Sequence, residues 1–369
     1  MSGDGDAICR VVENSLAITP WSSRKNAQCL VSMEDGDGNP IYADPRHILS
    51  TVLKRFEELE LKPVIAPEME FYLIDQKLQK NGHPQMPLIP GTNRRYEEVQ
   101  LLNLNEMDDF EGFFDLVEKS ARSLGIPAET AIKECAPGQF EINLLHHDDA
   151  LLMADQAFLM KRSIKNSAKK FNLNATFMAK PHQGQPGSSM HIHQNLVSIK
   201  TNKNIFSDDE GKESDAFYQY IGGLQTYLPD AMVFFAPYVN SYRRFVIDAS
   251  APINTHWGFE NRTVGLRVPL SAPESKRVEN RIPGADTNPY LAIAASLACG
   301  LLGLKEKIEP EKPIAGDAFE RRHNIPKYLP DALKRLKVSN ELAESLGKEF
   351  VSLYTEIKQT EHDAYQNVI

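Results

Sequence analysis

Alternating apolar and charged residues predict a strand at residues 67–73 with two unlike faces. The stretch reads PEMEFYL. Because neighbouring side chains on a strand point to opposite faces, Glu68 and Glu70 share one face, and Met69 and Phe71 lie on the other. Two adjacent carboxylates repel each other and are costly to hold away from water unless a cation lies between them. The pair favours a metal-binding face, although a single Glu-x-Glu is also typical of a solvated acidic strand.

The same patterns predict an alternation of helices and strands along the rest of the chain. Asp44-Pro45 and Asn288-Pro289 combine an N-cap residue with proline at the first helical position. Residues 1–43 alternate short apolar stretches with turn residues and predict a small β unit. Helical spacing covers residues 45–59, 108–125, 150–171, 214–228 and 289–304, and strand patterns cover residues 67–73, 128–145, 173–179, 190–195 and 277–281.

A second acidic pair, Glu134 and Glu141, lies in the segment KECAPGQFE. A separation of seven would place the two side chains on opposite faces of a regular strand. Pro137-Gly138 should interrupt the strand, however, and a turn or bulge there can return both carboxylates to one face. The interruption makes convergence with the first pair possible.

Two further segments carry polar side chains at strand spacing. His191 and His193 share one face of the sequence MHIHQN, and Glu279 and Arg281 share one face of RVENR. Strand histidines are also typical of a surface or of a hydrogen-bonded core, and scattered arginines of a solvated surface. Each segment taken alone is therefore open to either interpretation.

Composition narrows the possible functions. The chain has 369 residues, 41% of them hydrophobic and 25% charged, as in an ordinary globular protein. Its formal charge of −9 and the lack of a basic run argue against nucleic acid as a partner. Four separated cysteines, no secretory signal at the N-terminus and no apolar run long enough for a bilayer predict a cytoplasmic protein without membrane contact.

Carboxylates, histidines and arginines in this combination suit phosphoryl transfer from a metal-bound nucleotide. Metal ions hold and neutralise the phosphates, and arginines stabilise charge on the transferred group. Oxygen-rich ligands with few imidazoles favour Mg²⁺ or Mn²⁺ over zinc. The residue set therefore predicts an ATP-dependent enzyme with two or more divalent cations.

Six ordered segments resemble the glutamine synthetase family, over a match from about residue 44 to residue 297. The segments read PEMEF (67–71), KECAPGQFE (133–141), GSSMHIH (187–193), NSYRR (240–244), NRTVGLR (261–267) and ENRIP (279–283). The resemblance implies an α+β fold, with a partial N-terminal β-grasp unit at residues 1–43 and a catalytic domain at residues 44–369. That domain would hold a curved, mostly antiparallel sheet flanked by helices. Subunits would assemble into rings, with active sites at the subunit interfaces.

The resemblance also implies a role for each matching residue. Glu70, Glu134 and Glu141 would hold one divalent ion, and Glu68, His191 and Glu279 a second. Other positions would contact the substrates ATP and glutamate. Glu129, His193, Arg262, Arg267 and Arg277 would bind ATP, Gly187, Arg244 and Arg281 would bind glutamate, and Arg262 and Arg281 would act in catalysis. ATP would convert glutamate into γ-glutamyl phosphate, which an amine then attacks.

One position departs from the pattern of ammonia-using members. Ser250 stands where those members have a glutamate that helps to deprotonate ammonium, and serine can neither ionise nor attract a small cation in that way. The departure favours an organic amine as acceptor, as in the γ-glutamylpolyamine (γ-glutamylputrescine) synthetase branch. Ammonia as the acceptor, or a non-catalytic relative that keeps the fold, are the alternatives. A base for the amine is not identified, and Asp248 is a candidate only through its nearness in sequence.

Overall fold

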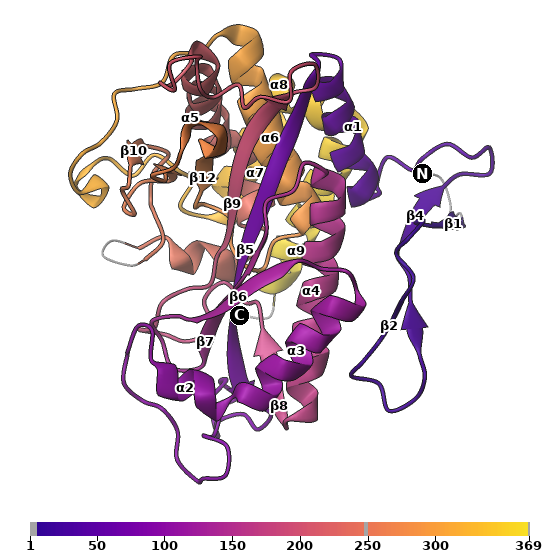
Figure 1. The fold of residues 1–369 in the computed structure, drawn as a ribbon, viewed down its shortest axis with the longest axis vertical. Coiled ribbons are helices and arrows are strands. Elements are labelled where there is room, and N and C mark those ends of the chain that lie inside the picture. Colours follow the sequence, from indigo (N-terminus) through magenta and orange to yellow (C-terminus); the bar gives the residue numbers. More distant parts are fainter. Residues whose placement is uncertain (1–5, 247–249, 368–369) are drawn as a thin grey trace.

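A single long strand, β5 (Leu61–Asp75), organises the sheet. The computed structural model describes residues 6–246 and 250–367. In it β5 pairs antiparallel with three strands, β7 (Gln139–Leu144), β8 (Leu173–Thr176) and β9 (Met190–Ser198). Figure 1 shows β5 and β9 running side by side through the middle of the molecule.

The main sheet is mixed but mostly antiparallel. Its order is β10-β11-β12-β9-β5-β7-β6, with β8 paired to β5 off this path, and β10 and β11 alone run parallel. The remaining strands are β6 (Ala128–Lys133), β10 (Trp257–Phe259), β11 (Leu266–Val268) and β12 (Val278–Asn280). This arrangement confirms the predicted α+β class with a mostly antiparallel sheet.

Helices cover the apolar face of the sheet. Met69 and Phe71 of β5 are completely buried in the main core together with residues of α1, α4 and α6, whereas Glu68 and Glu70 project from the other face. In Figure 1 α6 lies behind the long strands, and α1 and α4 lie to their right. The helices are α1 (Pro45–Glu57), α2 (Leu104–Asp109), α3 (Glu111–Ser123), α4 (Ala150–Lys170), α5 (Asp215–Phe235), α6 (Pro289–Glu306), α7 (Leu329–Val338), α8 (Asn340–Leu346) and α9 (Lys348–Gln366).

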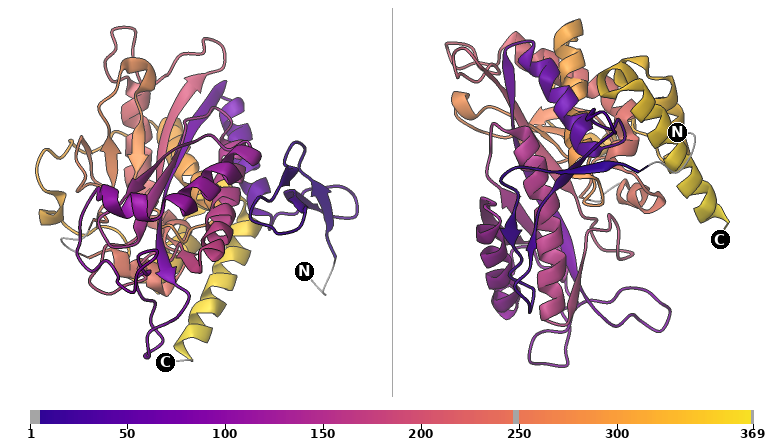
Figure 2. Two further views of the ribbon diagram at one scale, coloured as in Figure 1. Left: turned by 60° about the horizontal axis from the view of Figure 1, so that its bottom comes forward. Right: turned by 90° about the vertical axis from the view of Figure 1, so that its right-hand side faces the viewer.

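The N-terminal residues form two separate two-stranded antiparallel sheets. β1 (Ile8–Val11) pairs with β4 (Val31–Glu34), and β2 (Ala17–Ile18) pairs with β3 (Ala27–Gln28). Both views in Figure 2 show this unit beside the helices rather than within the main sheet. A hydrogen bond of 2.7 Å from Arg162 Nε on α4 to Gln28 Oε1 is one of its few polar contacts with the body.

Local sequence signals place some helix ends correctly and others wrongly. The single helix predicted over residues 108–125 is two helices, α2 and α3, and α3 begins only at Glu111. Asp44 accepts a hydrogen bond from the Arg46 amide at the start of α1, as a cap should. The helix predicted to stop at residue 228 continues to Phe235, with Pro229 in its interior. Its last turns are apolar and buried, so packing outweighs the helix-breaking tendency of proline. Among the helices of the described ranges, none combines the length and apolar character needed to cross a membrane.

Candidate active site

Strand register brings the first acidic residue and both histidines together. Glu68 on β5 lies directly opposite His191 on β9, and Ala66 lies opposite His193. His191 Nδ1 is 3.2 Å from Glu68 Oε2, and His193 Nε2 is 2.7 Å from Glu68 Oε1. Both imidazoles are buried, so Glu68 is their shared acceptor at the centre of the sheet.

The second acidic pair converges through a turn. Glu70 on β5 lies opposite Glu141 on β7, and Glu134 immediately follows β6, where its amide donates to the Gln139 carbonyl at 3.0 Å. Gly138 has a positive φ of 71° in this turn, a conformation that favours glycine. The interruption at Pro137-Gly138 therefore does turn the chain between the two carboxylates.

A buried ion pair between Lys133 and Glu106 holds the backbone of the turn at Pro137-Gly138. Lys133 Nζ donates to the carbonyls of Glu134 and Ala136 and lies 3.4 Å from Glu106 Oε2. Glu106 Oε1 accepts from the Gly138 amide at 2.6 Å. Both charged side chains are almost fully buried, and together they fix the backbone that carries Glu134.

Electrostatics distinguish the carboxylates from one another. Burial and the charges of Glu68, Glu70 and Glu134 raise the pKa of Glu141 to about 9. Burial and the charge of Glu134 raise the pKa of Glu70 to about 8. Burial acts to raise the pKa of Glu68 as well, but the hydrogen bonds with His191 and His193 outweigh it and lower that pKa. Without a cation, Glu70 and Glu141 therefore stay protonated near neutral pH, and a bound cation would favour their ionised forms.

Binding of Mn²⁺ at pH 7 is expected to release about one to two protons per chain, because Glu70 and Glu141 must ionise to bind a cation. Both carboxyl groups have pKa values above their usual 4.5, so the folded metal-free protein holds protons that the unfolded chain has lost. Its free energy of unfolding should therefore fall as the pH rises from about 4.5 to about 9. Calorimetric titration in buffers of different ionisation enthalpy measures the released protons, and a count of zero at pH 7 would contradict this assignment.

Glu279 is held by two guanidinium groups. It lies opposite His193 on β9 and Arg267 on β11. Arg267 Nη1 donates to Glu279 Oε2 at 2.9 Å, and Arg281 Nη1 donates to Glu279 Oε1. Burial acts to raise the pKa of Glu279, but the charge of Arg281 outweighs it and lowers the pKa. Glu279 is thus ionised and only 1% exposed.

His193 differs from His191 in its hydrogen bonds. Arg277 Nε donates to His193 Nδ1 at 3.1 Å, so Nδ1 is an acceptor. In neutral His193 the proton is then on Nε2, which donates to Glu68. This arrangement connects Arg277 to Glu68 through one imidazole.

Arg244 packs beneath the loop that contains Gly187. Its guanidinium donates to the Ile282 carbonyl at 3.0 Å and to Ser189 Oγ at 2.9 Å, and the side chain is 1% exposed. A β-carbon at Gly187 would lie 2.4 Å from Arg244 Cγ, so glycine is required there. The Ser189 amide also donates to Glu70 at 2.9 Å and thereby joins this region to the acidic cluster.

Three predicted residues, Glu129, Ser250 and Arg262, are exposed rather than buried with this cluster. Arg262 is exposed, and its charge offsets part of the rise that burial causes in the pKa of Glu134. Glu129 is exposed on β6, next to a register shift between Ala128 and Ala131. Ser250 is exposed too. Asp248 lies outside the described residues.

Sequence reasoning missed several residues that shape the site. His146 packs edge-on against His193, with ring centroids 5.9 Å apart, and burial together with His193 and Arg277 lowers its pKa to about 4. Gln139 donates to the Gly187 carbonyl at 3.0 Å. Gln139 lies two residues before Glu141 on β7, so strand parity could have placed the two on one face, whereas the contact of His146 with His193 joins segments that are distant in sequence.

Two clusters of carboxylate and imidazole ligands could each hold a divalent cation, although their members differ from the two ligand triplets expected from the sequence. Ligand atoms of Glu68, Glu141 and His191 all lie within 4.8 Å of one another, as do those of Glu68, His193 and Glu279. Glu68 belongs to both groups.

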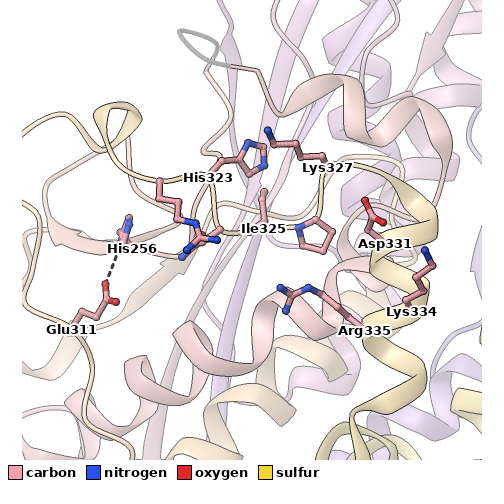
Figure 3. Close-up of a pocket in the computed structure, with 11 residues that line it drawn as sticks. His256, Glu311, His323, Ile325, Lys327, Asp331, Lys334 and Arg335 are labelled. Atoms are coloured by element: carbon pink, nitrogen blue, oxygen red, sulfur yellow. Dashed lines mark hydrogen bonds and ion pairs between the residues drawn. The ribbon is translucent and has the colours of Figure 1, made fainter.

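The pocket in Figure 3 is lined by other residues, among them His256, Arg322 and Arg335, so it is separate from this cluster.

Comparisons with known proteins agree with this geometry. Residues 42–369 match the family description "Glutamine synthetase, catalytic domain". Gamma-glutamylputrescine synthetase PuuA of Escherichia coli K12 is 36% identical over 370 residues, which cover 100% of this chain and 78% of that protein. Glutamate–isopropylamine ligase of a Pseudomonas species is 35% identical, covering 94% of this chain and 75% of that protein.

Ammonia-using relatives and solved structures lie in the same range of similarity. Glutamine synthetase of Methanocaldococcus jannaschii is 31% identical, covering 99% of this chain and 81% of that protein. The structures described as apo GmaS and as a GmaS/ADP complex superpose with TM-scores of 0.87 and 0.88 at 26% identity, covering 100% of this chain and 84% of each of those chains. The chain therefore belongs to the glutamine synthetase family and is an ATP-dependent ligase that joins glutamate to ammonia or an amine.

Proposed function

We propose that the acceptor is an organic amine, and specifically a polyamine such as putrescine. The observation that carries this proposal is Ser250, an exposed, uncharged residue at the position where ammonia-using members have a glutamate. A short hydroxyl side chain leaves room for a larger nucleophile and offers no charge to attract ammonium. The names of two relatives with similar identity, which specify putrescine and isopropylamine, support the same class.

The carboxylates and His191 would hold the divalent cations. We assign Glu70, Glu134 and Glu141 to one ion and Glu68, His191 and Glu279 to a second, with Glu68 close to both. A bound divalent cation would neutralise these carboxylates and polarise the phosphates of ATP. Lys133 and Glu106 would keep Glu134 in position.

The arginine side of the cluster would bind the nucleotide. Arg267 lies on β11 and His193 on β9, both opposite Glu279, and Arg277 immediately precedes β12. The exposed Glu129 would contact the far end of ATP. Arg262 would stabilise the charge on the phosphoryl group during transfer.

Glutamate would bind beside Arg244 and Arg281. Both guanidiniums are buried near Glu70 and Glu279, and Gly187 allows the backbone to approach closely. A γ-carboxylate oxygen attacks the terminal phosphorus of ATP and ADP departs. The amine nitrogen then attacks the acyl carbon of γ-glutamyl phosphate, inorganic phosphate leaves, and the nitrogen loses a proton.

Phosphate release should depend on putrescine or another polyamine far more than on ammonium. Such an amine has a solution pKa near that of lysine, about 10.4, so the rate with polyamine should rise with pH until the bound amine is deprotonated. The measurement is phosphate release across a panel of amines with ATP, Mg²⁺ and glutamate. A clear preference for ammonium would reject the polyamine assignment and leave the ligase assignment intact.

The variant Ser250→Glu provides a matched test of the same position. It restores a carboxylate that could attract and deprotonate ammonium, so activity with ammonium should rise relative to activity with putrescine. An unchanged ratio would show that Ser250 does not set the acceptor.

Ammonia is the second candidate acceptor, because glutamine synthetases are nearly as similar to the chain as the amine ligases are. The amine panel decides between the two. A non-catalytic relative would bind neither Mn²⁺ nor an ATP analogue, which a binding titration tests. We also propose that the subunits assemble into a ring, with active sites between subunits. The proposed location is the cytoplasm.

A further inference from the structure

Four buried polar side chains form a network behind the strand that carries Glu279. They are Gln194 on β9, Asn280 on β12, Tyr220 on α5 and Ser296 on α6. All four are completely buried. Side chains alternate along a strand, so Gln194 and Asn280 point to the helices, and α6 lies behind the long strands in Figure 1. The residues just before them, His193 and Glu279, point to the acidic cluster.

Ser296 is at the centre of the network. Its Oγ accepts a hydrogen bond from Gln194 Nε2 at 2.9 Å and another from Asn280 Nδ2 at 3.0 Å. At the far end, the Tyr220 hydroxyl donates to Gln194 Oε1 at 2.8 Å. One hydroxyl group on α6 is thus bonded to two neighbouring strands at once.

The two bonds to Ser296 fix how β12 is aligned with β9. Glu279 lies directly opposite His193, whereas Gln194 and Asn280 are offset from each other by two positions. A slip of β12 by one residue would turn Glu279 away from the acidic cluster. A slip by two would move the Asn280 side chain about 7 Å along the strand and away from Ser296. The hydrogen bonds are therefore compatible with a single register.

β12 has little backbone pairing of its own to hold this register. It has three residues, Glu279 among them, and only two of them pair with β11. Asn280 also holds the chain where it leaves the strand, because its Oδ1 accepts from the Ile282 amide at 3.1 Å. The Ile282 carbonyl in turn accepts from Arg244 at 3.0 Å. The network therefore extends to both the proposed second cation and the proposed glutamate site.

A gain in stability does not account for these polar groups. Complete burial of two amide side chains costs free energy, which their hydrogen bonds only offset. Apolar side chains of the same shape would stabilise the fold about as well. A satisfied polar network instead selects one arrangement, because every other arrangement leaves a buried donor or acceptor unpaired.

We propose that Ser296 is a positioning residue for the second cation. Through Gln194 and Asn280 it locks β12 against β9. The lock keeps Glu279 beside Glu68, in the group whose ligand atoms all lie within 4.8 Å of one another. Ser296 lies on the opposite face of the sheet from these ligands, so it acts only through the two strands. The inference rests on the proposed function, which assigns Glu279 to a cation.

A two-site Mn²⁺ titration of the full chain, followed by the electron paramagnetic resonance signal of free Mn²⁺, tests the proposal. Glu279→Gln identifies which of the two affinities belongs to the second cation. Ser296→Ala removes the shared acceptor and no metal ligand. It should weaken binding at that same site by about tenfold or more, the usual effect of losing a group that orients a ligand, and leave the other site within about twofold. Tyr220→Phe removes only the outermost hydrogen bond, so it should cause a smaller loss at the same site.

Ser167→Ala is the matched control. Ser167 lies on α4 and is as completely buried as Ser296, but its Oγ has no hydrogen-bond partner among the described residues. Both Mn²⁺ affinities should stay within about twofold of those of the parent, because the site is not coupled to this hydroxyl. Hydrogen exchange in EDTA provides a readout without metal. The amides of residues 278–282 should exchange faster in Ser296→Ala than in Ser167→Ala.

Equal weakening of both Mn²⁺ sites by Ser296→Ala, or unchanged exchange at residues 278–282, would overturn the proposal. A loss in Glu279→Gln that neither Ser296→Ala nor Tyr220→Phe shares would also overturn it, while the assignment of Glu279 to a cation would stand. If Glu279→Gln leaves both affinities unchanged, that assignment fails, and the positioning role of Ser296 fails with it.

Discussion

Glu141→Gln is expected to lower ligase turnover by about 1,000-fold or more while the metal-free protein becomes more stable. The substitution removes a proposed metal ligand, which accounts for the loss of activity. It also removes a carboxyl group that folding destabilises in its ionised form. Burial and the charge of Glu68 raise the pKa of Glu141 to about 9, so at pH 8 folding keeps this group protonated at a cost in free energy. Activity with ATP, glutamate and amine, and thermal unfolding in EDTA at pH 8, measure the two effects.

The opposite signs of the two effects make this prediction specific. A residue with a purely structural role would lose stability together with activity. Glu349→Gln, on the exposed surface of α9, is a matched control that should change neither quantity. Stabilisation by Mn²⁺ should also be much smaller in Glu141→Gln than in the control. A metal-free Glu141→Gln protein that unfolds at a lower temperature than the parent would contradict the electrostatic argument.

Lys133→Met is expected to destabilise the protein by about 3–5 kcal/mol, because it leaves Glu106 buried without its cation. Lys133 also donates to the carbonyls of Glu134 and Ala136, so the turn that carries Glu134 should loosen. We therefore expect weaker Mn²⁺ binding along with the lower stability. Chemical denaturation and a metal titration measure both.

A double variant separates the buried charge from the shape of the turn. Glu106→Gln keeps an oxygen for the Gly138 amide and removes the unpaired charge, so Lys133→Met/Glu106→Gln should recover much of the lost stability. Metal affinity should recover less, because the donor to the Glu134 carbonyl is still missing. A double variant as unstable as Lys133→Met alone would mean that the ion pair is not the source of the effect.

Much of the fold and of the acidic cluster follows from local sequence rules. Strand parity groups Glu68 with Glu70 and His191 with His193, and the structure places these four residues on adjacent strands. The Asp44 cap and the interruption at Pro137-Gly138 are equally local signals. Such features depend on residues within a few positions of one another, and a single sequence displays them directly.

Other features depend on packing between distant segments and cannot be predicted in this way. No spacing rule pairs Glu106 with Lys133 or places His146 against His193. The pairing of Glu279 with Arg267 requires the register of β11 and β12, and α5 continues through Pro229 only because its last turns are buried. The resemblance assigned His193 to ATP, while the hydrogen bond from Arg277 and the contact with Glu68 appear only in the structure.

The central position of β5 has a consequence for biosynthesis. Its three pairing partners lie between residues 139 and 198, so more than half of the chain must leave the ribosome before the sheet can close. Before β7 has emerged, Met69 and Phe71 have no strand beside them, and Ile65 must wait for β9, so these apolar side chains are exposed. Such long-range pairing slows folding and exposes the nascent chain to aggregation. We expect this ligase to require chaperones during its synthesis.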